Sequence, residues 1–324
     1  MSLRTAIAYQ VFDRPDLTRR SFAAIAAARP SRLFVFADGP RTEADRIQVE
    51  ATRAIVRQVD WDCEVHQHFS DTNLGCRRRL VSGLDWVFSH VDEAIVIEDD
   101  CLPDPSFFPF CEALLDHYRD DPEVVMVCST NYLQEWRPEE RDYHFSHIGS
   151  PWGFGIWKRA WALYEDDITP WGRPEVRARI QALLDDEDVF AFEAGRFDWL
   201  LADPEDRHCW DLIWMFTHLA HGTKCVVPAR NLLENLGNAG PGGLPPDHPV
   251  ARLTASSAPL PVRFHDDPVD REYDHLHVDR QSAYWIERAR RAVPSPPGPL
   301  RRITPPWAKR LVRRVGSRLR GGSA

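Results

Sequence analysis

Residues 94–108 read AIVIEDDCLPDPSFF, and this stretch constrains the fold more than any other part of the chain. The apolar run Ala94–Ile97 leads directly into three acidic residues, Glu98, Asp99 and Asp100. A short, continuous apolar run is typical of a strand that is buried on both faces. Ligands of open α/β sheets bind at the carboxyl ends of strands, and clustered carboxylates favour a hard divalent cation carrying a diphosphate. The stretch therefore predicts a Mg²⁺ or Mn²⁺ site at a strand end, with a solvated acidic turn as the alternative.

Strand and helix patterns alternate over the first 130 residues. Strand-like runs occur at 5–11, 32–37, 63–69, 94–97 and 124–128. One helical pattern ends near residue 28, and three others cover 47–59, 80–91 and 107–118. In the second helical pattern, an apolar residue recurs every four positions, at Ile47, Ala51, Ile55 and Val59. Repeated β-α-β units at this spacing predict an α/β fold, Rossmann-like, with a mostly parallel sheet flanked by helices. No GxGxxG or GxxxxGK[ST] motif opens a helix, which disfavours a dinucleotide or Walker-type phosphate loop.

Composition restricts the partners and the compartment. The chain has 324 residues and a net charge of −9, which disfavours nucleic acid as a partner. The chain has seven cysteines, an odd number, and no CxxC motif. This pattern favours reduced thiols in a cytoplasmic protein. We find no signal peptide at the N-terminus and no apolar run long enough to span a membrane.

The C-terminal region differs from the rest. Residues 292–306 are proline-rich and predict a semi-rigid linker. Residues 301–324 contain eight basic residues and no acidic one, and apolar positions fall on one helical face. This pattern predicts a basic amphipathic helix with peripheral contact to the inner face of the membrane, or a disordered basic tail.

Four segments give the chain a resemblance to GT-A glycosyltransferases, which spans about residues 5–240. More narrowly, the chain resembles the N-acetylglucosaminyltransferase I type and the related bacterial family-2-like enzymes. The segments are VFDRPD (11–16), CRRRLVSGLDWVF (76–88), VIEDDCLPDPSFF (96–108) and the pair PWGFGIWKRAW (151–161) with CWDLIWM (209–215). The resemblance implies transfer of a sugar from a nucleotide-sugar donor, with a UDP-sugar favoured, by direct displacement with inversion at the anomeric carbon. It also implies Mn²⁺ or Mg²⁺ as cofactor, and a glycan or glycolipid acceptor of the kind used in bacterial polysaccharide biosynthesis.

The resemblance assigns a role to each acid of the strand end. It makes Asp100 the ligand of the metal that bridges the donor diphosphate. Asp99 would contact the ribose or the metal-bound phosphates, and Glu98 the transferred sugar. A metal and arginines can stabilise the charge that develops on a leaving diphosphate, so these assignments agree with the chemistry.

Further roles follow from the other segments. Arg14 and Asp38 would hold the base and ribose, and Arg77 falls at the place of a basic donor-binding residue. Asp211 is the candidate general base, because one positioned carboxylate can remove the proton of the acceptor hydroxyl. Trp210 would form a wall of the sugar site. The alternative for Asp211 is an ordinary acid at a helix N-terminus, which the helix dipole favours.

The resemblance also suggests a division of the chain. Residues 1–240 would form one large domain, with a nucleotide-binding half to about 130 and an acceptor-side half at 131–240. Residues 241–290 would form a lid or extension, and 291–324 the linker and tail. The segment Asn235-Leu236-Gly237-Asn238 resembles a donor-side loop of the bacterial relatives, in which a later histidine, here His248, would be a further metal or phosphate ligand.

Two other functions remain open from the sequence. A sugar nucleotidyltransferase could use a related sheet, but its family has a glycine-rich basic loop after the first strand, where this chain reads VFDRPDL. A non-catalytic sugar-nucleotide-binding or scaffold protein of the same fold would bind the donor without turnover. The intact group of three acids argues against loss of catalysis.

Overall fold

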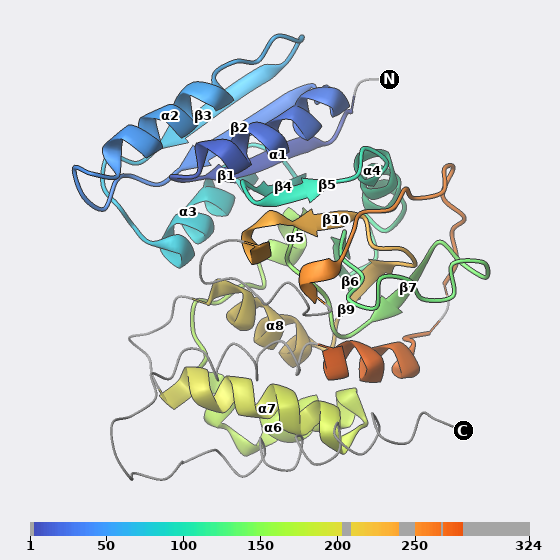
Figure 1. Cartoon of the computed structure of the whole chain (residues 1–324). Helices are drawn as coiled ribbons and strands as arrows, with labels where there is room; N and C mark the ends of the chain where they lie inside the picture. Colours follow the sequence, from blue (N-terminus) through green and yellow to red (C-terminus); the bar gives the residue numbers. More distant parts are fainter. Residues whose placement is uncertain (1–2, 203–208, 240–249, 267, 281–324) are drawn as a thin grey trace.

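A mixed sheet organises the chain in the computed structural model, which describes residues 3–202, 209–239, 250–266 and 268–280 (Figure 1). Within these residues the sheet has eight strands in the order β3-β2-β1-β4-β8-β6-β9-β7. The strands are β1 (Ala6–Val11), β2 (Arg32–Ala37), β3 (Glu64–Phe69), β4 (Glu93–Glu98), β6 (Val124–Cys128), β7 (Tyr143–Ser146), β8 (Phe154–Trp157) and β9 (Lys224–Pro228). Strands β1 to β4 pair in parallel, whereas β8 is antiparallel to both β4 and β6, and β7 is antiparallel to β9.

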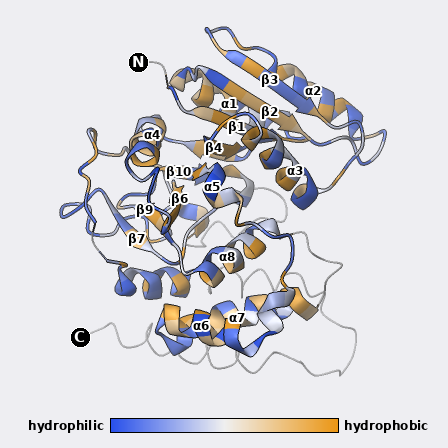
Figure 2. Cartoon of the chain, turned by 180° about the vertical axis from the view of Figure 1, so that it is seen from behind, coloured by the Kyte–Doolittle hydropathy of each residue, from blue (hydrophilic) through white to orange (hydrophobic). Residues whose placement is uncertain are grey.

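Helices cover both faces of this sheet. The helices are α1 (Pro15–Ala28), α2 (Arg46–Val56), α3 (Cys76–Phe88), α4 (Phe107–His117), α5 (Lys158–Trp161), α6 (Pro174–Leu184), α7 (Glu187–Ala202) and α8 (Trp210–His221). Helices α1, α2 and α4 contribute to the core on one face, and α3, α5 and α8 to the core on the other. Helices α6 and α7 pack beneath α8 around a third cluster (Figures 1 and 2).

Smaller elements complete the described part of the chain. A two-stranded sheet pairs β5 (Cys101–Pro103) with β10 (Leu233–Asn235) in antiparallel register. The single turns are η1 (Thr169–Gly172), η2 (Leu236–Ala239) and η3 (Val250–Arg252), and residues 271–280 are helical. No helix of the described residues is long and apolar enough to cross a membrane.

The predicted α/β class is confirmed, as are the strands and helices expected in the first 130 residues. All seven cysteines lie in the described ranges, and each is a free thiol. The two antiparallel strands β7 and β8 fall in the predicted acceptor-side half, 131–240, for which the sequence analysis predicted no strand. The proposed domain division stays a prediction, and the linker, the basic tail and His248 lie outside the described residues.

One predicted helix face is wrong. Ile47 is 75% exposed and Ala51 is also exposed, whereas α2 buries Val49, Thr52 and Val56. Residues four positions apart lie about 40° further around the helix axis than one full turn. Residues that recur strictly every four positions therefore drift around the helix and do not share one face. The face packed against α1 instead uses steps of three and four.

A group of neutral histidines lies in the second half of the core. The buried histidines are His144, His147, His218 and His277. Burial lowers their pKa values to about 3, 4, 3 and 3 respectively.

We expect these histidines to make the fold acid-sensitive. Below about pH 6.5 these histidines bind protons in the unfolded chain but stay neutral in the folded chain. The stability of the fold therefore falls as the pH decreases toward the folded pKa values. His218→Leu removes one such group from a fully buried position and should flatten the decrease of the unfolding midpoint between about pH 7 and pH 5. His117→Leu, on α4, is the control. Equal pH slopes for His218→Leu and the wild type in thermal unfolding would contradict this account.

Candidate active site at the carboxyl end of strand β4

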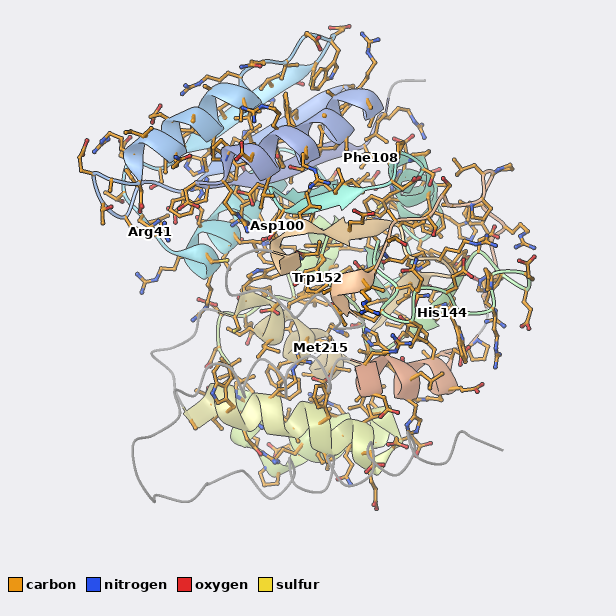
Figure 3. All side chains as sticks on the ribbon, in the orientation of Figure 1. Arg41, Asp100, Phe108, His144, Trp152 and Met215 are labelled. Carbon is orange, nitrogen blue, oxygen red and sulfur yellow. The ribbon has the colours of Figure 1, made fainter. Side chains whose placement is uncertain are left out.

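The alternation of β4 sends its terminal acids to opposite faces of the sheet. Val96 belongs to the core under α3 and α8, and Ile97 to the core under α1 and α4. Since successive side chains of a strand alternate, Glu98 points toward α3 and α8, and Asp99 toward α1. Asp100 follows in a turn before β5, near the centre of the view in Figure 3.

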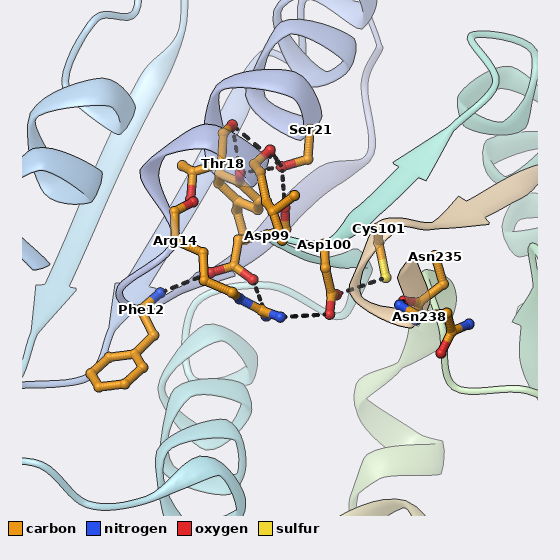
Figure 4. Close-up of polar contacts among 11 residues, drawn as sticks. Phe12, Arg14, Thr18, Ser21, Asp99, Asp100, Cys101, Asn235 and Asn238 are labelled. Atoms are coloured by element: carbon orange, nitrogen blue, oxygen red, sulfur yellow. Dashed lines mark hydrogen bonds and ion pairs between the residues drawn. The ribbon is translucent and has the colours of Figure 1, made fainter. Parts of the chain in front are cut away.

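Asp99 is held by the segment that joins β1 to α1. Its side chain is 3% exposed, accepts a hydrogen bond from the Phe12 amide at 3.1 Å and forms an ion pair with Arg14 (Figure 4). Its carbonyl accepts the Ser21 hydroxyl at 2.9 Å, and Ser21 in turn contacts the Tyr9 hydroxyl at 2.6 Å. Burial raises the pKa of Asp99 to about 6, and the charge of Arg14 opposes the rise.

Asp100 lies between Arg14 and the residues after β10. Its Oδ2 atom accepts a hydrogen bond from Arg14 Nη1 at 2.9 Å, and its carbonyl accepts the Leu236 amide at 2.8 Å. A Cβ atom at Gly237 would overlap the Asp100 carboxylate and come within 3.2 Å of Asn235 Oδ1. The pairing of β10 with β5 therefore brings the predicted donor-side loop, 235–238, against the predicted metal ligand.

Glu98 faces the first turns of two helices on the other side of the sheet. Burial raises its pKa to about 8, and the charges of Asp100, Asp99 and, to a smaller extent, Asp211 act in the same direction. Cys76, the first residue of α3, has its pKa raised to about 12 by burial and by the charges of Glu98 and Asp211. The charges of the predicted general base, Asp211, and of the predicted sugar contact, Glu98, thus act on the same groups at this end of β4.

The sequence analysis did not single out Gln10. In the sheet register it lies directly beside Glu98, and its buried Oε1 atom has no hydrogen-bond partner among the described residues. The alternation of β1 could have identified it, because Ala6 and Ala8 share the core of α3 and α8. Gln10 thus offers a free acceptor next to Glu98.

Asp38 stabilises a turn at the carboxyl end of β2. Its two oxygens accept hydrogen bonds from the amides of Gly39, Leu74 and Gly75 at 2.8–2.9 Å and from the Asn73 side chain at 3.0 Å. The turn leads into α3 through Gly75, whose φ of +81° favours glycine. The contact of Asp38 with the base or ribose stays a prediction, and its carboxylate already accepts four hydrogen bonds.

Arg77 and Trp210 make contacts with residues other than the three acids. Arg77 forms an ion pair with Asp166 at 2.5 Å, and Arg79 is buried and donates to the His68 carbonyl at 2.7 Å. Trp210 is 4% exposed and packs on Phe154, with ring centroids 5.9 Å apart. This burial leaves little of Trp210 for a sugar, and its predicted role is not supported by the packing.

The donor set around Asp100 fits a hard divalent cation completed by a substrate. Asp100 offers carboxylate oxygens and Asn235 an amide oxygen that also accepts the Asn238 amide at 3.2 Å, and Mg²⁺ commonly uses one or two carboxylates together with phosphates and water. In the described ranges no group of three or more His, Cys, Asp or Glu side chains could hold a metal by itself. The residues therefore fit a cation that arrives with a diphosphate better than a permanent metal centre.

Comparison with known proteins adds little to this geometry. No protein-family model matches the sequence, and no curated protein matches it. Among solved structures, the chain is similar to UDP-glucose pyrophosphorylase in complex with UDP-glucose, with 10% identity and a TM-score of 0.35. That alignment covers 71% of this chain and 94% of the other. A similarity at this level carries no argument about function.

Loss of the Asp38 carboxylate should destabilise the fold. Asp38→Ala leaves three partly buried donors of the 73–75 turn without their acceptor, which should cost about 3 kcal/mol of unfolding free energy. Asp16→Ala is the matched control, because the Asp16 side chain is 96% exposed and its ion pair with Arg19 is at the surface. Urea unfolding at neutral pH measures both, and equal losses would contradict the structural role of Asp38.

Glu98→Gln should stabilise the metal-free protein at alkaline pH. The folded pKa lies above the unfolded value of 4.5, so the folded chain loses stability as the pH rises from 4.5 to about 8. Glutamine does not ionise, so the unfolding midpoint of the variant should rise relative to that of the wild type between about pH 5 and pH 9. Thermal unfolding in the presence of EDTA tests this, and a constant difference across that range would contradict the raised pKa.

Proposed function

We propose that the chain is a metal-dependent, inverting glycosyltransferase that uses a nucleotide-sugar donor and a hydroxyl acceptor. The observation that supports the proposal is the negative charge at the carboxyl end of β4, where the charges of Asp100 and of Asp211, more than 100 residues away in sequence, both raise the pKa of Glu98. Substrates of open α/β sheets bind at this edge. The site thus has separate groups for a leaving diphosphate and for an attacking hydroxyl.

The donor diphosphate would lie between Asp100 and the start of α3. Asp100 and Asn235 would hold Mg²⁺ or Mn²⁺, which when bound neutralises charge on the leaving diphosphate. Helix α3 begins at Gly75 with no side-chain cap and has no acid in its first turn, so its amides and dipole favour an anion. Both features support a diphosphate at this position.

The acceptor would approach from the side of α8. Asp211 is the second residue of α8 and would take the proton of the acceptor hydroxyl as the bond to the sugar forms. Glu98, with its raised pKa, would be protonated at neutral pH and could donate a hydrogen bond to the transferred sugar. The unpartnered acceptor of Gln10 lies beside it and would orient the same group.

The finer specificity rests on the resemblance of the sequence. It favours a UDP-sugar donor, with Asp38 and the 12–14 segment near the base and ribose, and a glycan or glycolipid acceptor. A nucleotidyltransferase would instead release pyrophosphate from a nucleoside triphosphate and a sugar phosphate. We regard this as the alternative outcome of the assay.

Asp100→Ala should abolish sugar transfer and the metal-dependent binding of nucleotide. Because a ligand that binds only the folded state raises the unfolding midpoint, Mn²⁺ with UDP or a UDP-sugar should raise that midpoint in the wild type and not in the variant. Asp104→Ala, a change in the same segment, is the control, since Asp104 contacts Ser106 and not the site. Transfer is followed as UDP release with a panel of acceptors.

Full activity in Asp100→Ala would remove this residue from the mechanism. Pyrophosphate release with a nucleoside triphosphate would favour the nucleotidyltransferase. Donor binding without turnover on any acceptor would favour a scaffold protein.

A further inference from the structure

The guanidinium of Arg14 lies between the two acids of the strand end, Asp99 and the predicted metal ligand Asp100. Arg14 Nη1 lies 2.9 Å from Asp100 Oδ2, and Nη2 contacts Asp99 Oδ1 (Figure 4). The Arg14 side chain is 42% exposed, whereas those of Asp99 and Asp100 are 3% and 16% exposed. A solvent-accessible cation therefore compensates two largely buried carboxylates.

We propose that Arg14 is an internal counter-ion that competes with the divalent metal for Asp100 and transfers to the donor diphosphate, so that metal and nucleotide bind as a coupled pair. The inference rests on the proposed function and adds a role to a residue expected only to hold the base or ribose.

The Arg14 backbone is fixed, and the side chain is the part that can move. The carbonyl of Arg14 accepts hydrogen bonds from the Thr18 amide and the Thr18 hydroxyl, both at 2.9 Å. Pro15 follows at the first position of α1, and the preceding Phe12 amide is bound to Asp99. A shift of the guanidinium therefore requires rotation of side-chain bonds alone, without movement of α1.

Asp100 has no room for two cations on the same oxygen. The backbone of Gly237 lies against the Asp100 carboxylate on one side, and Arg14 binds its Oδ2 atom on the other. A metal at that oxygen would lie close to the guanidinium, and two positive charges at such a short distance repel each other. Metal binding to Asp100 Oδ2 thus requires the guanidinium of Arg14 to leave that oxygen.

A diphosphate provides the destination for Arg14. The planar guanidinium matches phosphate oxygens in a bidentate geometry and is only weakly hydrated. Once Arg14 pairs with the diphosphate, Asp100 is available to the metal. Such a coupling is reciprocal, so nucleotide must tighten metal binding by the same factor as metal tightens nucleotide binding.

Mn²⁺ binding to the full chain, measured by calorimetry and by the EPR signal of free Mn²⁺, tests this directly. Wild type should bind Mn²⁺ weakly alone and at least about tenfold more tightly with UDP present. Arg14→Met should bind Mn²⁺ alone at least about tenfold more tightly than wild type, with a UDP effect below about threefold. Arg41→Met removes the same charge from the neighbouring loop, where Arg41 pairs with Asp13 and Asp45, and should behave as wild type.

Mn²⁺ affinity in Arg14→Met that is equal to or lower than that of wild type would overturn the proposal, as would the same gain in Arg41→Met. If Arg14→Met does not fold by circular dichroism, Arg14→Lys replaces it, since one ammonium cannot bridge both acids. That variant should gain at least about threefold in Mn²⁺ affinity, and no gain would overturn the proposal.

This experiment distinguishes failure of the proposed function from failure of the role of Arg14. An Arg14→Met variant that gains Mn²⁺ affinity, together with a wild type in which no nucleotide affects Mn²⁺, would remove the proposed function and the transfer to a diphosphate. The competition between Arg14 and metal would stand. Coupling by UDP in both proteins would keep the proposed function and overturn the role of Arg14.

Discussion

The concentration of negative charge at the buried end of β4 is the constraint on which the site depends. A central strand brings Glu98 and Asp99 out of water, and burial is the largest cause of the raised pKa of each. Arg14 is the cation that acts on both. Its position follows from the neighbouring strand, because β1 ends beside β4 and the chain then turns into α1. The first strand and the turn that follows it are thus arranged around the charge at the end of the fourth strand.

Strand alternation divides this charge between two regions with different surroundings. On the α1 side, Asp99 is bound by a backbone amide, a hydroxyl network and an arginine, which together fix the β1–α1 segment. On the α8 side, Glu98 faces Asp211 and the unpartnered acceptor of Gln10. The first region is saturated by protein contacts, whereas in the second the buried Oε1 atom of Gln10 has no partner among the described residues. Unsatisfied polar groups in a buried site are typical of groups that await a ligand.

The sequence predicted those parts of the structure in which local pattern and global fold agree. Periodicity predicted the apolar run of β4, the strands that precede it in the sequence, strand β6 after it, and the helices to residue 117. The face of α2 was not, because its packing against α1 buries Thr52 and Arg53, which periodicity counts as polar. Antiparallel β8 depends on pairing with distant β4, which no local pattern encodes. For Arg14, the resemblance implied contact with the donor, but its ion pairs to Asp99 and Asp100 require the register of β1 on β4.

The two halves of the site come from distant parts of the chain, and this separation limits how the site can form. Asp100 and its loop partner Asn235 approach each other only through the short pairing of β5 with β10, three residues long on each side. That pairing brings Gly237 so close to the Asp100 carboxylate that a side chain there would displace one of them. A substitution at Gly237 would therefore act on the Asp100 carboxylate without altering any acid. The glycine at this position is as much a part of the candidate metal site as the carboxylate that it touches.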